Sequence, residues 1–150
     1  NPFSDRMHSR NSIWEIIETP GHTKDHLAFL NLQTGQLFTG DLYVTPKTKV
    51  IMQSESIPTI IKSLAKVLAY QFDDVFCQHS GYVEDGRRML AAKKEYLEEI
   101  QHKILTLHKN GFTIKEIQKQ LFPQKYAITK FSSGDWDSIH IINSVIFDQN

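Results

Sequence analysis

The chain has 150 residues, of which 40% are hydrophobic and 23% are charged, as in ordinary soluble globular proteins. Its 17 Lys and Arg residues balance 17 Asp and Glu residues, so overall charge gives no support for binding to nucleic acid or to a membrane surface. The single cysteine, Cys77, excludes an internal disulfide framework, and no apolar run approaches the ~20 residues of a membrane span. With no signal-peptide pattern, we expect a cytoplasmic protein made of one domain, or of one small domain with an appendage.

The first third of the chain predicts strands. Residues 1–12 are polar and predict a loop. The segments that follow are short, apolar and separated by turn residues, which predicts strands at 13–19, 26–32, 37–40 and 49–52. Pro20 and Gly21 end the first of these strands. Gly35 permits the tight turn of an antiparallel hairpin between the second and the third.

From Ile57 the spacing of apolar residues changes from two to three or four. This spacing continues to about Tyr70, with Pro58 in the first turn, and predicts an amphipathic helix. Residues 74–77 then predict a short buried strand, followed by a loop at 78–81. The order strand, helix, strand, loop is typical of a layered α/β unit, so the predicted fold class is α/β.

The remainder predicts helices. An apolar stripe predicts a long helix from about Glu84 to Lys109, and Asn110-Gly111 supplies its left-handed cap. Thr113 and Glu116 form a capping box that begins a second helix, which ends before Pro123. A last short helix is expected within 134–149.

Three polar side chains follow the predicted strands: His22, Asp41 and His79. Imidazole and carboxylate groups are the ligands that zinc and similar metals prefer. Each of the three lies next to or near a glycine, which lets the backbone pass close to a crowded site. On spacing alone, a histidine after a Pro-Gly turn is more often an ordinary loop residue than a metal ligand.

The identity of the neighbouring residues favours metal ligands over ordinary loop residues. The ordered set 20-PGHTKDH-26, 37-LFTGDLY-43 and 78-QHSG-81 resembles the metallo-β-lactamase superfamily, in particular its glyoxalase-II-like and lactamase-β-like hydrolases. The resemblance covers about residues 13–100. It implies an αββα sandwich, of which this chain supplies the second half.

The resemblance also implies a role for each candidate. His22 would ligate a first metal, His79 a second, and Asp41 would bridge both and act as the catalytic residue that orients the attacking hydroxide. Two zinc ions are implied, with iron or manganese as alternatives. Such a pair hydrolyses a thioester, ester or phosphoester bond in a small-molecule substrate by activating water and polarising the substrate oxygen.

One family motif is absent. The first half of the family's sandwich carries H-x-H-x-D-H, and the nearest segment here, 22-HTKDH-26, has different spacing. Three ligands for two ions leave two protein ligands for each, whereas catalytic zinc usually has at least three. We therefore expect the 150-residue chain to be an incomplete fragment that binds metal weakly and is inactive alone. We also expect its apolar sheet face to pair with the missing half or with a second copy, as a homodimer or in a swapped arrangement.

Four further histidines have no ligand-like neighbours: His8, His102, His108 and His140. His26 leads a predicted strand, so we expect it to make a structural hydrogen bond beside the metal site and not to be a ligand. Cys77 lies in an apolar strand and is expected to be a small buried side chain.

We divide the chain into an α/β part, 1–83, and a helical region, 84–150. Within the latter, 103–123 has the pattern helix, Asn-Gly turn, helix, which resembles the winged-helix-like tail of lactamase-β-like proteins, some of them endoribonucleases. Lysines are present, but nearby glutamates dilute them. A helical cap over the active-site side of the sheet, or a packing hairpin, is favoured, and the alternative is a nucleic-acid or protein interaction module.

Overall fold

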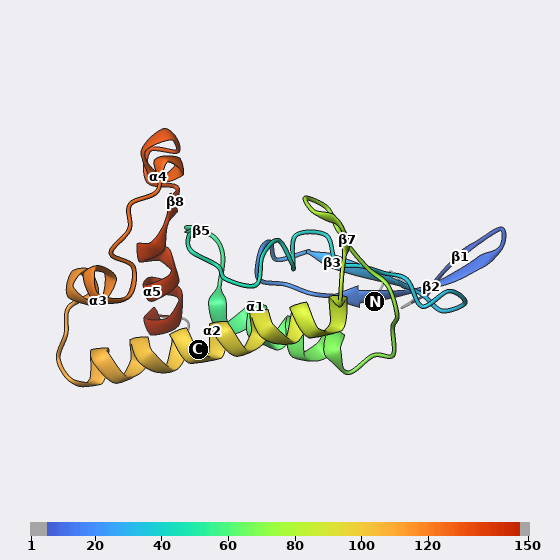
Figure 1. Cartoon of the computed structure of the whole chain (residues 1–150), viewed down its shortest axis with the longest axis horizontal. Coiled ribbons are helices and arrows are strands. Elements are labelled where there is room, and N and C mark those ends of the chain that lie inside the picture. The colour runs from blue at the N-terminus through green and yellow to red at the C-terminus, as the bar shows by residue number, and fades with distance from the viewer. Residues whose placement is uncertain (1–5, 148–150) are drawn as a thin grey trace.

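The computed structural model describes residues 6–147 and shows a mixed sheet with helices along one side (Figure 1). The six-stranded sheet has the order β1 (Arg6–Ser9), β2 (Ser12–Glu18), β3 (Leu27–Asn31), β4 (Leu37–Phe38), β6 (Val75–Cys77) and β7 (Gly81–Val83). The second sheet pairs β5 (Ile51–Met52) with β8 (Trp136–Asp137). The helices are α1 (Ile57–Leu68), α2 (Gly86–Lys109), α3 (Ile114–Leu121), α4 (Ala127–Phe131) and α5 (Ser138–Phe147).

Strand direction within the large sheet decides where its loops meet. β2 pairs antiparallel with β3, and β3 pairs antiparallel with β4, so β2 and β4 run the same way. β4 pairs parallel with β6, with Leu37 opposite Val75. The crossover that a parallel pair requires contains α1. The ends of β2, β4 and β6 therefore lie at one edge of the sheet.

One face of the sheet forms the core with α1 and α2. Successive cross-strand pairs point alternately to the two faces of the sheet. The apolar residues on the helix side are buried: Ile17, Ala28, Leu30, Leu37, Val75 and Val83. They meet the buried stripes of the two helices, which include Leu64 and Val67 of α1 and Leu90 and Leu97 of α2. Cys77 is buried and unpaired in this core, as predicted.

The opposite face of the sheet is apolar and carries a row of aromatic rings. We call it the aromatic face, and it consists of Met7, Trp14, Ile16, Leu27, Phe29, Phe38, Phe76 and Tyr82. The rings of Phe38 and Phe76 stack at 5.1 Å, and the rings of Phe76 and Tyr82 meet at 5.7 Å. Phe38 is 39% exposed and Tyr82 is 58% exposed. No helix of the described part of the chain covers this face (Figure 1).

Most predicted elements are confirmed with shifts of one to three residues at their ends. The hairpin turn has Gly35 at φ 71°, and Gly111 follows α2 at φ 86°. Thr113 and Glu116 form both hydrogen bonds of the capping box at the start of α3. The predicted division at residue 83 falls between β7 and α2, and stays a prediction.

Two local predictions are wrong, and one short helix was not predicted. Residues 6–9 form a strand where a loop was expected, because they pair with the free side of β2 and Arg6 contacts Glu15 at 3.1 Å; the predicted loop's first five residues lie outside the described part. Gly81–Val83 is a strand, since it folds back on β6. The short helix α4 has no periodic apolar pattern that would have predicted it.

No helix among residues 6–147 is long and apolar enough to cross a membrane.

Gly86 begins α2 at the point where this helix approaches β6. A Cβ atom added there would overlap the side chain of Val75. We expect Gly86→Val to lower the free energy of unfolding by at least about 1–3 kcal/mol, because the buried strand beneath cannot move aside. Urea denaturation measures the change. Arg88→Ala, an exposed change two residues further along the helix, should stay within about 0.5 kcal/mol of the parent chain, and equal stability of both variants would contradict the expectation.

Candidate metal centre

The three predicted ligands are brought together at the sheet edge where β2, β4 and β6 end. His22 lies on the loop after β2, Asp41 closely follows β4, and His79 follows β6. His79 Nε2 lies 2.8 Å from Asp41 Oδ1, and His22 Nε2 lies 3.5 Å from Asp41 Oδ2. Each oxygen of the Asp41 carboxylate therefore faces a different imidazole.

The donor groups fit one part of a metal centre. Asp41 Oδ1 is buried and accepts no hydrogen bond from the described residues, because its contact with His79 has the distance of a hydrogen bond but not its geometry. A buried carboxylate oxygen that accepts no hydrogen bond lowers the stability of the folded chain. A carboxylate with one imidazole on either side suits a bridging ligand. No group of three His, Cys, Asp or Glu side chains within residues 6–147 is arranged around a single point, so the set is not closed.

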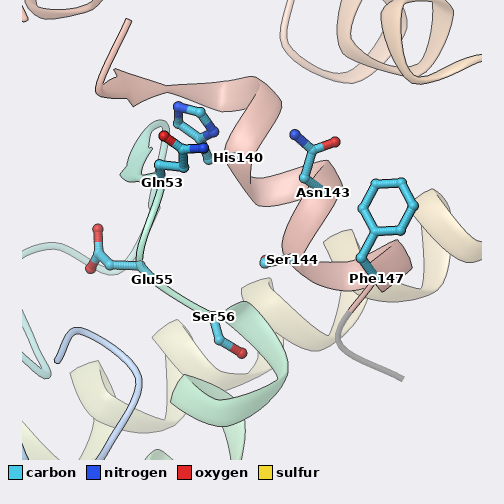
Figure 2. Close-up of a pocket in the computed structure, with 7 residues that line it drawn as sticks. All are labelled: Gln53, Glu55, Ser56, His140, Asn143, Ser144 and Phe147. Carbon is cyan, nitrogen blue, oxygen red and sulfur yellow. The ribbon is translucent and has the colours of Figure 1, made fainter. Parts of the chain in front are cut away.

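Glu55 orients His22 and was not anticipated from the sequence. Its Oε1 accepts a hydrogen bond from His22 Nδ1 at 2.7 Å, and its Oε2 accepts one from the Met52 amide at 2.6 Å. Figure 2 shows Glu55 on the segment between β5 and α1, with its carboxylate pointing away from α5. A proton on Nδ1 leaves Nε2 with a free electron pair directed toward Asp41, which is the usual state of a ligating histidine.

His26 supports the backbone of Asp41. Its Nε2 accepts a hydrogen bond from the Asp41 amide at 3.0 Å, so the ring proton is on Nδ1, which donates to Thr19 Oγ1 at 2.8 Å. The His26 ring is therefore neutral. Burial lowers the pKa of His26, and the neighbouring His22 lowers it further. This is the structural role expected for His26 from its position at the start of a strand.

Gly40 makes this support geometrically feasible. Its φ of 54° is in the left-handed region, which favours glycine. A Cβ atom at this position would also lie 2.8 Å from His26 Nε2. The glycine in 37-LFTGDLY-43 is thus required by the close approach of the His26 ring to the backbone.

Lys93 lies beneath the site on α2 and is only 6% exposed. Its Nζ donates a hydrogen bond to the Leu42 carbonyl at 2.8 Å, next to Asp41 in the chain. Burial lowers the pKa of Lys93 to about 8, although the carboxylates of Glu55 and Asp41 oppose this. The sequence contained a signal for it, because Lys93 interrupts the apolar stripe between Leu90 and Leu97.

A cavity of about 450 Å³ opens beside these residues, and we call it the site cavity. His22, Asp41 and His79 line it together with apolar and basic side chains, among them Val44, Val50, Trp136, Lys47 and Lys49. Trp136 comes from β8 in the helical region, because β8 pairs with β5 beside the site. The region 84–150 therefore contributes Trp136 to the wall of this cavity.

The neutral state of His26 has a measurable consequence. We expect its ring to titrate below the ordinary value of 6.5, with Nδ1 as the protonated nitrogen. Protonation of Nε2 would remove the acceptor for the Asp41 amide. The stability that neutral His26 contributes is thus fully present above pH 6.5 and is lost as the pH falls toward the lowered pKa. Long-range ¹H–¹⁵N NMR spectra follow both nitrogens, and a midpoint at or above 6.5 would contradict the assignment.

Comparison with known proteins identifies the fold. No family model matches the chain. Its structure is similar to the sec-alkylsulfatase Pisa1 from Pseudomonas sp., with a TM-score of 0.74 and 14% identity over 99% of this chain and 26% of that one. It is also similar to a metallo-beta-lactamase family protein from Thermus thermophilus, with a TM-score of 0.68 and 17% identity over 96% of this chain and 47% of that one. A metallo-beta-lactamase from Pontibacter korlensis has a TM-score of 0.53 and 15% identity over 62% of this chain and 45% of that one.

At these identities the similarity establishes the fold alone. The chain has part of the metallo-β-lactamase fold and spans about half, or less, of the length of these proteins. The predicted fold class, α/β with a partial sandwich, is therefore confirmed.

Proposed function

We propose that this chain, which has part of the metallo-β-lactamase fold, is the portion of a metal-dependent hydrolase that carries the bridging carboxylate. The observation that carries the proposal is Asp41 between His22 and His79 at the ends of three strands that run the same way. The substrates proposed are thioesters, esters or phosphoesters of small molecules. The site cavity, at about 450 Å³, is within the usual range for a small-molecule site.

Each residue of the site has a proposed part in that reaction. His22 would hold one metal ion, His79 the other, and Asp41 both; zinc is the first candidate, and iron and manganese accept the same donors. Bound metal would supply an activated water and polarise the substrate oxygen. Glu55 keeps the free electron pair of His22 on Nε2, and the neutral His26 holds the Asp41 backbone.

The lysines of the site cavity favour substrates with an acidic group. Lys47 and Lys49 line the cavity and are exposed, while Val44, Val50 and Trp136 provide apolar contact. An anion held by these ammonium groups would be oriented with its remaining part against the apolar wall. This supports a substrate that is an organic acid derivative over a neutral one.

We further propose that the aromatic face is an interface. A cavity of about 610 Å³ is lined by Leu27, Phe29, Phe38 and Phe76 of this face and also by Asp41. A second sheet packed on this face would be well placed to supply the further metal ligands that His22, Asp41 and His79 leave open. The natural occupant is the complementary half of the sandwich, and in its absence a second copy of this chain takes its place.

Metal-dependent hydrolysis tests the proposed function. In the full-length gene product supplied with zinc, Asp41→Asn should lower the rate of thioester or phosphodiester hydrolysis by about 100-fold or more, since several kcal/mol of polarisation would be lost. Bound zinc, measured by mass spectrometry of the intact protein, should fall in parallel. His102→Ala, an exposed histidine of α2, serves as the matched control. Unchanged zinc content and unchanged turnover in Asp41→Asn would reject the proposal.

Oligomeric state tests the aromatic face. We expect the 150-residue chain, whose monomer mass is 17.4 kDa, to form dimers in solution because burial of this face removes apolar area from water. Phe38→Lys and Tyr82→Lys should each shift the chain toward monomer in sedimentation equilibrium. Phe131→Lys removes a still more exposed ring from α4 and should leave the mass unchanged. If the unsubstituted 150-residue chain is a monomer at concentrations of about 100 μM, the result would count against the interface.

A further inference from the structure

The helical region contains a second and larger cavity, which we call the tail groove. Its volume is about 820 Å³, and it lies between α3, the segment that leads to α4, and the β8–α5 junction. These elements stand together at the end of α2 that is remote from the large sheet (Figure 1). The proposed hydrolytic function does not use this groove.

The tail groove is strongly basic. Four lysines line it: Lys115, Lys119, Lys125 and Lys130. Among its lining residues only Asp137 carries a negative charge, and this carboxylate accepts hydrogen bonds from Gln118 Nε2 at 2.8 Å and from the Ile139 amide at 2.9 Å. The groove therefore presents a local excess of positive charge although the whole chain is neutral.

The glutamates near these lysines in the sequence do not line the groove. Glu98 and Glu99 pair with Lys94 and Lys103 on α2, and none of these four residues lines the groove. Glu116 is engaged with Thr113 in the capping box. None of these glutamates lines the groove, so the dilution of basic residues that the sequence suggests is reduced within the groove lining.

Aromatic side chains accompany the lysines. Phe122 and Tyr126 line the groove and are partly exposed, with Pro123 between them. A ring of this kind offers a flat face on which a nucleobase can stack, whatever its sequence. An acidic peptide would be served by the lysines alone, so the combination of rings and ammonium groups favours a strand of bases and phosphates.

The tail groove lies next to the site cavity. Lys49, which lines the site cavity, places its ammonium group 5.6 Å from the centre of the Tyr126 ring, which lines the groove. Trp136 lines the site cavity, and the adjacent Asp137 lines the groove. Lys49 extends the row of positive charges from one cavity toward the other.

We propose that the tail groove binds single-stranded nucleic acid. Lys115, Lys119, Lys125 and Lys130 contact the phosphates, and Phe122 and Tyr126 stack on bases. The groove is a binding site whether or not the neighbouring centre holds metal, so the proposal goes beyond the proposed hydrolytic function and does not depend on it.

Fluorescence anisotropy with a labelled single-stranded RNA of about 12 nucleotides tests the proposal, in EDTA so that hydrolysis plays no part. With four phosphates neutralised, the logarithm of the affinity should fall with the logarithm of salt concentration with a slope of about −3. Lys119→Glu combined with Lys130→Glu should weaken binding by about 10-fold or more. Tyr126→Leu should weaken it by about 5-fold or more through loss of stacking.

The control applies the same change of charge outside the groove. Lys94→Glu combined with Lys103→Glu on α2 should weaken binding by less than about 2-fold. No salt-dependent binding, or equal weakening by both double variants, would overturn the proposal. It would also be overturned if an oligoglutamate peptide of equal charge displaced the RNA as well as unlabelled RNA does, because the groove would then be a site for acidic protein segments.

Discussion

The arrangement of the site depends on the common direction of β2, β4 and β6. Only parallel strands bring their carboxyl ends to one edge, and a parallel pair needs a crossover connection of a dozen residues or more. In this chain the crossover between β4 and β6 contains α1, whose apolar side packs against the sheet. Without that helix, His79 would follow a strand at the opposite edge and would not lie beside Asp41.

At this edge of the sheet, a chain of hydrogen bonds fixes the positions of His22 and Asp41. His22 is held by a carboxylate that is itself held by a backbone amide, and the Asp41 backbone is held by a neutral ring. Lys93 places a buried ammonium group near the two carboxylates, Asp41 and Glu55. These opposite charges offset part of the cost of burying the ammonium group, and its hydrogen bond to the Leu42 carbonyl offsets a further part, so a lysine is tolerated in the apolar stripe of α2.

The sequence was informative where one residue's role follows from its neighbours. The spacing of apolar residues predicted α1, α2 and the hairpin, and the ordered motifs placed His22, Asp41 and His79 together. It was uninformative where a role depends on a distant partner. Glu55 lies 33 residues from His22, so no local pattern connects them. β1 forms because β2 offers a free side, and the lysines of the tail groove are gathered in one place only by folding.

The continuity of α2 has a mechanical consequence. A helix of 24 residues is about 36 Å long, and this one runs unbroken from the sheet to the tail groove. It contains no proline and no internal glycine, so it has no natural position at which to bend. The two ends of the molecule are therefore joined by a stiff rod and not by a hinge. The segment at 44–49, which lines the site cavity, is tied to this rod, because the Tyr96 hydroxyl of α2 donates a hydrogen bond to the Thr48 carbonyl at 3.0 Å.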